Sequence, residues 1–291
     1  MRKIAVLNQK GGVGKTTTAV NLSAALARRG RKVCLADLDP QAHASLHLSS
    51  GLRDARLPDR NLYDVFIHEA NLRDITQPAG ENLWVIPSGI DLSAVELEMA
   101  GVAGREVILR QKLPVIDDDY DLLVIDCPPS LGILTLNALT AADEVFIPLQ
   151  PHFLALHGVS KLLETISLVS QRLNAQLTLA GVLLCMFESG TKLAKEVAGD
   201  VAEFFEQAHD QNTPWANARL FETKIRRNIK LAEAPSYGQS IFDYAPTSPG
   251  AQDYDALADE VVEHILPTAT ISISREEFIS QMDALSQPKV A

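Results

Sequence analysis

The sequence predicts an α/β fold in which a mostly parallel, twisted sheet is covered by helices on both faces. The first observation is that short apolar runs, typical of buried strands, alternate with longer segments of helical apolar spacing. The others are a glycine-rich turn after the first run and aspartates at the ends of two later runs. The predicted strands are Ile4–Leu7, Val33–Ala36, Leu83–Ile86, Leu122–Ile125, Val145–Ile147 and Ala180–Leu184.

A helix is predicted directly after the first strand and the glycine-rich turn. It begins near Lys15 and ends at Gly30, a residue type that commonly terminates helices. Its apolar residues recur at helical spacing, at Ala19, Val20, Leu22, Ala25 and Leu26. Strand, turn and helix therefore occur in the order that a phosphate-binding βα unit requires.

The turn itself reads "NQKGGVGKTTT" and differs from the common phosphate-loop pattern, because Gln9 stands where the first glycine is expected. Glycines allow the main chain to approach an anion and to point consecutive N–H groups at it. The start of the following helix adds positive potential at the same place. We therefore expect the loop to bind phosphate through its main chain at Gly11, Gly12, Val13 and Gly14.

Three side chains after the glycines extend this prediction from phosphate to a magnesium nucleotide. Lys15 is placed to reach the β- and γ-phosphates, and the Thr16 hydroxyl to ligate Mg²⁺. Thr17 is placed to touch the α-phosphate. A simple phosphate loop needs one lysine, so the second lysine of the turn, Lys10, requires a separate explanation.

Two aspartates, in the segment "CLADLDPQ", follow the second strand. Asp37 and Asp39 are separated by one residue, so they share one side of an extended chain, and Pro40 ends the strand. At the carboxyl edge of a parallel sheet they would face a bound phosphate. One aspartate would position an attacking water and the other support Mg²⁺; alternatively, Asp37 caps the following turn.

A third motif, "DLLVIDCPPS", places one carboxylate at the end of the fourth predicted strand. Four apolar residues precede Asp126, the setting of a Walker B aspartate that holds Mg²⁺ through water. Pro128 and Pro129 then turn the chain away. Together the three motifs predict a P-loop NTPase fold that binds ATP and Mg²⁺.

Composition and charge exclude several other classes of protein. The first strand follows so soon after Met1 that there is no room for a signal peptide, and no apolar run approaches membrane-spanning length, so we expect a cytoplasmic protein. Cys34, Cys127 and Cys185 are odd in number and lie in apolar contexts, as buried free thiols do. A net charge of −11 restricts any nucleic-acid binding to a local basic patch.

Four segments together resemble the ParA/Soj family of partitioning ATPases, within the larger MinD-like group. They are "KGGVGKTTT", "DLDPQ", "DCPPSLGILTLNALTAAD" and "IRRNIKLAEAPSYGQSI", and the resemblance runs from about Lys3 to Ile265. It implies a slow, partner-stimulated ATPase that dimerises with ATP and binds DNA nonspecifically on the nucleoid. A ParB-like centromere-binding protein is the implied partner, and Asp39 the residue that positions the hydrolytic water.

The resemblance also gives Lys10 a function. In similar proteins a lysine at this position crosses the dimer interface and touches the phosphates bound by the other subunit. A cation delivered in this way can stabilise the charge of phosphoryl transfer, as an arginine finger does. Lys10, Lys15 and Asp39 are accordingly the predicted catalytic residues.

Basic residues in "TKIRRNIKLAEAPSYG" are the predicted DNA-binding patch. They are Arg226, Arg227 and Lys230, which on both subunits of a dimer would form one salt-sensitive, sequence-independent surface. Relatives usually carry "IPRNVRLSEAPS" here, so Arg226 replaces a proline. In the alternative reading the Arg227–Asn228 turn approaches the adenine or the dimer interface, which leaves fewer residues for DNA.

The predicted ATPase domain spans residues 1–266, and residues 267–291 form a tail that is either partly helical or disordered. A MinD-like membrane ATPase would end in a basic amphipathic helix, whereas this tail is not basic, so stable membrane association is not expected.

An iron–sulfur carrier would need paired, exposed cysteines. An orphan ATPase that positions another cargo has the same motifs, and a neighbouring ParB-like gene would separate the two.

Overall fold

One nine-stranded sheet forms the centre of the computed structural model, which describes residues 1–52, 59–152, 155–209 and 212–264. The strand order is β3-β4-β2-β5-β1-β6-β7-β8, with β9 paired to β7; among the described strands, β3 and β4 form the one antiparallel pair. The strands are β1 (Arg2–Val6), β2 (Val33–Asp37), β3 (Gln77–Gly80), β4 (Leu83–Ile86), β5 (Leu122–Asp126), β6 (Glu144–Leu149), β7 (Thr178–Phe187), β8 (Arg219–Leu220) and β9 (Ile225–Arg226). All the predicted strands are confirmed, and the parallel α/β class with them.

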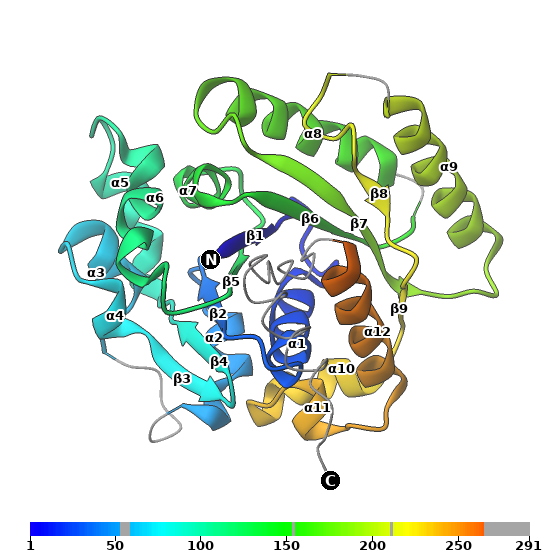
Figure 1. The fold of residues 1–291 in the computed structure, drawn as a ribbon, viewed down its shortest axis with the longest axis horizontal. Helices are drawn as coiled ribbons and strands as arrows, with labels where there is room; N and C mark the ends of the chain where they lie inside the picture. The colour runs from blue at the N-terminus through cyan, green and yellow to red at the C-terminus, as the bar shows by residue number, and fades with distance from the viewer. Residues whose placement is uncertain (53–58, 153–154, 210–211, 265–291) are drawn as a thin grey trace, which may run out of the picture.

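Helices cover both faces of the sheet (Figure 1). On one face lie α1 (Lys15–Arg28), α2 (His43–His47), α10 (Ile229–Glu233), α11 (Ile241–Tyr244) and α12 (Pro249–His264). On the other lie α3 (Leu62–Ile67), α4 (Leu72–Ile75), α5 (Val95–Glu98), α6 (Ile108–Lys112), α7 (Ile133–Ala141), α8 (Ala155–Arg172) and α9 (Lys192–Ala208). Short 3₁₀ turns include η3 (Ile90–Ala94) and η6 (Ala234–Tyr237).

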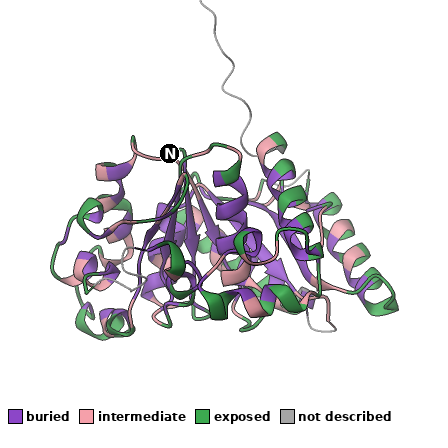
Figure 2. Ribbon diagram, turned by 90° about the horizontal axis from the view of Figure 1, so that it is seen from below, coloured by how far each residue is buried: buried purple, intermediate pink, exposed green. Residues whose placement is uncertain are grey.

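Each face of the sheet has its own hydrophobic core, because successive residues of a strand point to opposite sides. Ile4, Val6 and Phe146 belong to the core under α1 and α12, and Ala5 and Leu7 to the core under α7 and α8. Figure 2 shows the buried strands as a middle layer between partly exposed helices. Within the described ranges, no helix combines the length and apolarity needed to cross a membrane.

The carboxyl ends of three strands meet next to the glycine-rich turn. β1 lies between β5 and β6, and Val6 is in register with Asp126 of β5. Asp37 of β2 is in register with the same Asp126. In open α/β sheets, ligands bind outside the carboxyl ends of strands where the chain order reverses. The three predicted motifs are therefore brought to one edge.

α1 has the boundaries expected from the sequence to within two residues. Gly14 is its N-cap with a φ of 96°, and Gly30 follows its end with a φ of 78°. Both angles lie in the left-handed region that glycine adopts without strain. The first turn of α1 contains no acidic residue, so the positive potential of the helix start is not neutralised from within.

His47 of α2 makes the stability of the fold depend on pH. The imidazole is 1% exposed, and its Nε2 atom has no hydrogen-bond partner in the described structure. Burial lowers its pKa to about 4, against the opposing effect of a hydrogen bond with the Gln239 main chain. The unfolded chain, with a histidine pKa near 6.5, therefore binds a proton that the native state does not between pH 6.5 and 4.

We expect His47 to contribute a fall in the free energy of unfolding as the pH drops through this window, of up to about 3 kcal/mol. Urea unfolding at pH 7.5 and pH 5 measures the change. When the pH is lowered from 7.5 to 5, the free energy of unfolding of His47→Gln should change in the stabilising direction relative to the change in the wild type. An equal difference in both proteins would assign the pH dependence to other groups.

Candidate functional site

The glycine-rich turn forms an open loop between β1 and α1. Gly12 has a φ of 73°, and nothing lies within 4 Å of a Cβ placed on Gly11 or Gly12. The start of the loop is fixed by Asn8, whose Nδ2 donates to the Pro148 carbonyl at 2.7 Å and whose Oδ1 accepts from Lys10 N at 3.0 Å. The loop is thus anchored at its base and open above the glycines, as a main-chain anion site requires.

Lys15 is a buried cation at the base of this loop. Lys15 is 7% exposed, and its Nζ donates to the Lys10 carbonyl oxygen at 3.4 Å. Burial lowers the pKa of Lys15, while the nearby charges of Asp126 and Asp39 oppose that shift. A phosphate at the loop would supply the anionic partner that favours the charged amine.

Thr16 and Asp126, the two residues of the predicted magnesium site, are in contact. Thr16 Oγ1 donates to Asp126 Oδ2 at 2.7 Å. The other oxygen, Oδ1, is buried and has no hydrogen-bond partner in the described structure. Burial and the neighbouring Asp37 raise the pKa of Asp126 well above its usual range. A divalent cation, or its bound water, would give Oδ1 a partner and favour the ionised carboxylate, so the donor set fits Mg²⁺.

Asp37 holds the turn after β2 together. Its carboxylate accepts from Asp39 N at 3.1 Å, from Ser45 N at 2.8 Å and from Ser45 Oγ at 2.7 Å. The residue is fully buried, and this burial raises its pKa to about 6. The contacts match the turn-capping alternative for Asp37, whereas Asp39 is the aspartate of this motif whose charge acts on Lys15 of the loop.

Asp39 is placed by that turn. Its Oδ1 accepts from Gln41 N at 2.9 Å, and its carbonyl accepts from Ser88 Oγ at 2.8 Å. Asp39 is 9% exposed, and its negative charge acts to raise the pKa of Lys15, against the effect of burial. Asp39 therefore lies near Lys15 of the phosphate loop. In the described hydrogen bonds of the turn, its carboxylate takes part through Oδ1 and not through Oδ2.

A pocket of about 550 Å³ adjoins the loop. Thr17 of the predicted phosphate site lines it, and so do Arg227 and Asn228. Its other lining residues, which the sequence did not predict, include Cys185, Met186, Ile225, Ile229, Leu231 and Tyr254. They are mostly apolar and come from β7, β9, α10 and α12, so only the tertiary fold brings them together. A flat aromatic ring would fit such a lining.

A β-bulge shapes the wall of this pocket. The pairing of β7 with β9 shifts register between Cys185 and Phe187, and Met186 at the shift has a φ of 51°. Positive φ is uncommon for residues other than glycine and is tolerated where the surrounding structure determines it. The bulge interrupts the regular pairing of β7 with β9 at Met186, and Met186 lines the pocket.

The three predicted DNA-binding cations are each paired with a carboxylate. Arg226 is bound most firmly: its main-chain N donates to Asp253 Oδ2 at 2.8 Å, and its Nη2 to Asp253 Oδ1 at 2.7 Å. Arg227 pairs with Glu188 at 2.6 Å, and Lys230 with Glu233 at 2.8 Å. Their side chains remain 51%, 60% and 45% exposed. Arg226 attaches β9 to α12, a structural role that the sequence did not reveal.

All three cysteines are free thiols buried in the sheet, as predicted. Burial raises the pKa of Cys185 to about 12 and raises those of Cys34 and Cys127 as well. Such thiols are poor nucleophiles at neutral pH. In the part of the chain that the structure describes, no three His, Cys, Asp or Glu side chains gather as they would to hold a metal ion.

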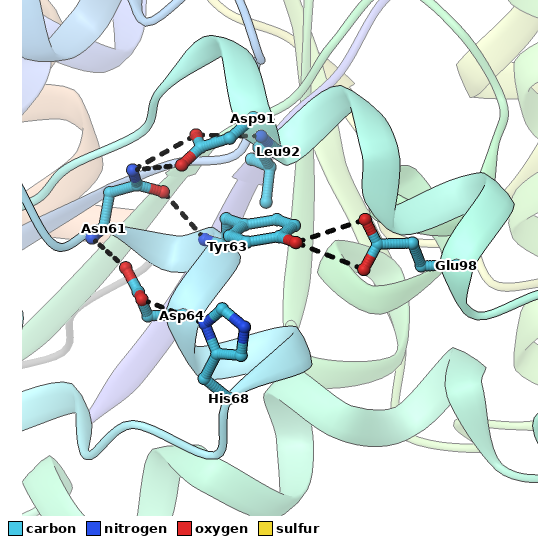
Figure 3. A network of polar contacts seen from close by, with 7 residues as sticks. All are labelled: Asn61, Tyr63, Asp64, His68, Asp91, Leu92 and Glu98. Atoms are coloured by element: carbon cyan, nitrogen blue, oxygen red, sulfur yellow. Dashed lines mark hydrogen bonds and ion pairs between the residues drawn. The ribbon is translucent and has the colours of Figure 1, made fainter.

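A polar network fixes the segment that follows β4. Asn61 caps α3 and donates from Nδ2 to both oxygens of Asp91, and the Tyr63 hydroxyl donates to Glu98 at 3.1 Å (Figure 3). Asp64 completes the capping box and also contacts His68 at 3.2 Å. These contacts tie η3 and α5 to α3, so the side chains between Ile90 and Glu98 have a fixed base.

Comparison with known proteins gives consistent matches. A family model described as an AAA domain matches residues 1–179. The chain is 44% identical over 259 residues to the sporulation initiation inhibitor protein Soj of Bacillus subtilis, covering 89% of this chain and 97% of that protein. It is 43% identical over 263 residues to the chromosome-partitioning ATPase Soj of Treponema pallidum, covering 90% and 97%.

Among solved structures, a Mycobacterium smegmatis protein described as cobyrinic acid a,c-diamide synthase is similar, with a TM-score of 0.74 and 36% identity. The match covers 91% of this chain and 96% of that one, and the structure contains an ATP analogue and magnesium.

Proposed function

Because this chain belongs to the ParA/Soj family of chromosome-partitioning ATPases, we propose that it hydrolyses ATP as an ATP-gated dimer switch that acts on DNA. The observation that carries the ATPase assignment is the buried Lys15, set below an open glycine loop and beside Asp39 and Asp126. A lysine near two aspartates provides the kinds of side chain that bind a phosphate chain together with its Mg²⁺ ion.

Each residue of the loop has a proposed role in that reaction. The main chain of Gly11, Gly12, Val13 and Gly14 binds the phosphates, and Lys15 contacts the β- and γ-phosphates. Thr16 ligates Mg²⁺ directly and Asp126 holds it through water. When bound, Mg²⁺ neutralises charge on the phosphate oxygens. Asp39 positions the attacking water, and Asp37 fixes the turn that carries Asp39.

The pocket beside the loop is proposed to take the adenine and ribose. Thr17 and Gly14 connect it to the phosphate loop, and Asn228, the N-cap of α10, also lines it. The Asn228 side chain accepts from Lys230 N at 2.8 Å, which fixes its orientation. This arrangement supports the reading in which this turn contacts the nucleotide through Asn228, while the exposed Arg227 side chain is left for DNA.

Dimerisation is proposed to occur through the edge that carries the phosphate loop. Lys10 is exposed there. Large apolar side chains are exposed in segments that follow strands β4 and β5: Ile90 is 71% exposed, Leu97 80% and Leu131 36%. Glu96 lies against Gly132, at 2.7 Å from a Cβ placed there, so the two segments adjoin. An exposed apolar patch on a fixed base is typical of a protein interface.

DNA binding is proposed for Arg227 and Lys230, while Arg226 is assigned to the attachment of β9. The variant Arg227→Glu with Lys230→Glu should lose DNA retention at least tenfold at about 0.1 M salt, because each lost phosphate contact removes close to one released counterion. Retention on nonspecific duplex DNA with ATP measures the effect, and light scattering checks that dimerisation persists.

A matched control carries the same change of charge elsewhere, as Lys32→Glu with Lys161→Glu. Both lysines are exposed. If the control loses DNA as strongly as the variant, overall charge explains the result. If the variant keeps full retention, the proposed patch is wrong.

The proposed partner is a ParB-like centromere-binding protein that stimulates hydrolysis, and the proposed location is the cytoplasm, over the nucleoid. An orphan ATPase that positions another cargo would use the same site. The proposed domain is residues 1–266; the tail, residues 267–291, lies outside the described residues. We propose no stable membrane association, on the non-basic sequence of that tail.

A further inference from the structure

Helices α8 and α9 enclose a groove on the face of the sheet opposite α1 and α12. It consists of two adjoining hollows of about 360 and 510 Å³ that share Ser160 and Phe204. The groove is separate from the proposed nucleotide site, since none of its described lining residues lines the pocket beside the phosphate loop.

The floor of the groove is apolar and rests on the core. Val159, Leu163, Val201 and Phe205 are buried core residues. Above them Leu168 is 52% exposed and Phe204 37%, although both are large apolar side chains. A partner that covers these side chains would remove apolar surface from water, which favours binding.

Among the described residues that line the groove, the charged side chains are all acidic. Glu164 of α8 and Asp200 and Glu203 of α9 line it, all on exposed positions. No lysine or arginine is among the described residues that line it. An apolar floor between acidic rims complements a helix that has one apolar face and basic flanks.

We propose that the α8/α9 groove binds a basic amphipathic helix of a partner protein. The chain's own tail is the less favourable occupant, because residues 267–291 contain Glu276, Glu277 and Asp283 against Arg275 and Lys289. Its net negative charge would face the acidic rim. The proposal does not rest on the proposed function, and it requires neither ATP nor DNA.

The probe is a fluorescein-labelled peptide of about 18 leucines and lysines arranged to form one apolar and one basic helix face, about 27 Å long. Anisotropy is measured with the full chain at physiological salt. In a Trp84→Phe background, which removes the other tryptophan of the chain, emission of Trp215, which lines the groove, reports the same event inside the site. A scrambled peptide of equal composition and a glutamate analogue test the need for the amphipathic face and the positive charge.

Two variants locate the binding. Leu168→Glu and the double variant Glu164→Lys with Asp200→Lys should each raise the dissociation constant at least tenfold. Because all three side chains are exposed, neither variant should disturb folding. The control Glu81→Lys with Asp118→Lys changes two exposed acidic residues by the same charge elsewhere and should stay within twofold of the wild type.

Equal weakening in the control, equal binding of the scrambled peptide, or Trp215 emission that does not respond would overturn the proposal. So would displacement of the probe by a peptide of residues 267–291, since the tail would then be the natural occupant.

Discussion

Replacing Lys15 by alanine is expected to abolish ATP binding, with an affinity loss of at least a hundredfold, or about 3 kcal/mol. The variant removes a buried cation that the phosphates would contact by charge-assisted hydrogen bonds. It also leaves Asp39 and Asp126 near the loop without the positive charge that offsets them. Titration calorimetry with Mg-ATP measures the loss.

Lys32→Ala, at an exposed lysine before β2, is the matched control and should bind ATP like the wild type. Circular dichroism should show both variants folded. An unchanged ATP affinity in Lys15→Ala would mean that the phosphates bind elsewhere, and the assignment of the whole loop would have to be withdrawn.

Replacing Asp39 by alanine is expected to slow hydrolysis at least a hundredfold while ATP still binds, so that the protein accumulates as an ATP-bound dimer. The reason is that Asp39 is proposed to orient the attacking water, whereas binding relies on the loop and Lys15. Phosphate release measures the rate, and light scattering measures the size of the protein with ATP.

Asp118→Ala serves as the comparison for Asp39→Ala, because Asp118 is exposed. It should hydrolyse ATP at the wild-type rate. If Asp39→Ala also hydrolyses ATP normally, or stays monomeric with ATP, the role of Asp39 is refuted while the role of Lys15 remains.

Much of the fold was predictable because its strands are continuous apolar runs. The missed strands lack that signal: β8 and β9 are two residues each, and β3 contains a proline and a glycine at the sheet edge. These short strands are defined by their neighbours rather than by their own composition. β9, for example, is extended because it pairs with β7.

The site was predictable where motif and strand end coincide. Lys15, Thr16 and Asp126 are brought together because parallel strands end at one edge. The pairing of Arg226 with Asp253 was not predictable, since it joins residues 27 positions apart through the packing of α12. The pocket lining was missed for the same reason, because Cys185 and Tyr254 come from distant elements.

Asp37 shows the limit of spacing arguments. The alternation of Asp37 and Asp39 is compatible with two catalytic carboxylates or with one catalytic and one structural residue. The hydrogen bonds of Asp37 to Ser45, which spacing does not predict, favour the structural role for this residue. A buried carboxylate that accepts its hydrogen bonds from the protein itself stabilises the fold.

The central claim is that Lys10 joins two subunits across bound ATP. Its most direct test is the molar mass by light scattering of wild type and Lys10→Ala with Mg-ATP and with Mg-ADP, under conditions where both proteins bind nucleotide. We predict that the wild type is a dimer with ATP and a monomer with ADP, and that Lys10→Ala is a monomer with both. A dimer of Lys10→Ala with ATP, as stable as that of the wild type, would contradict the account.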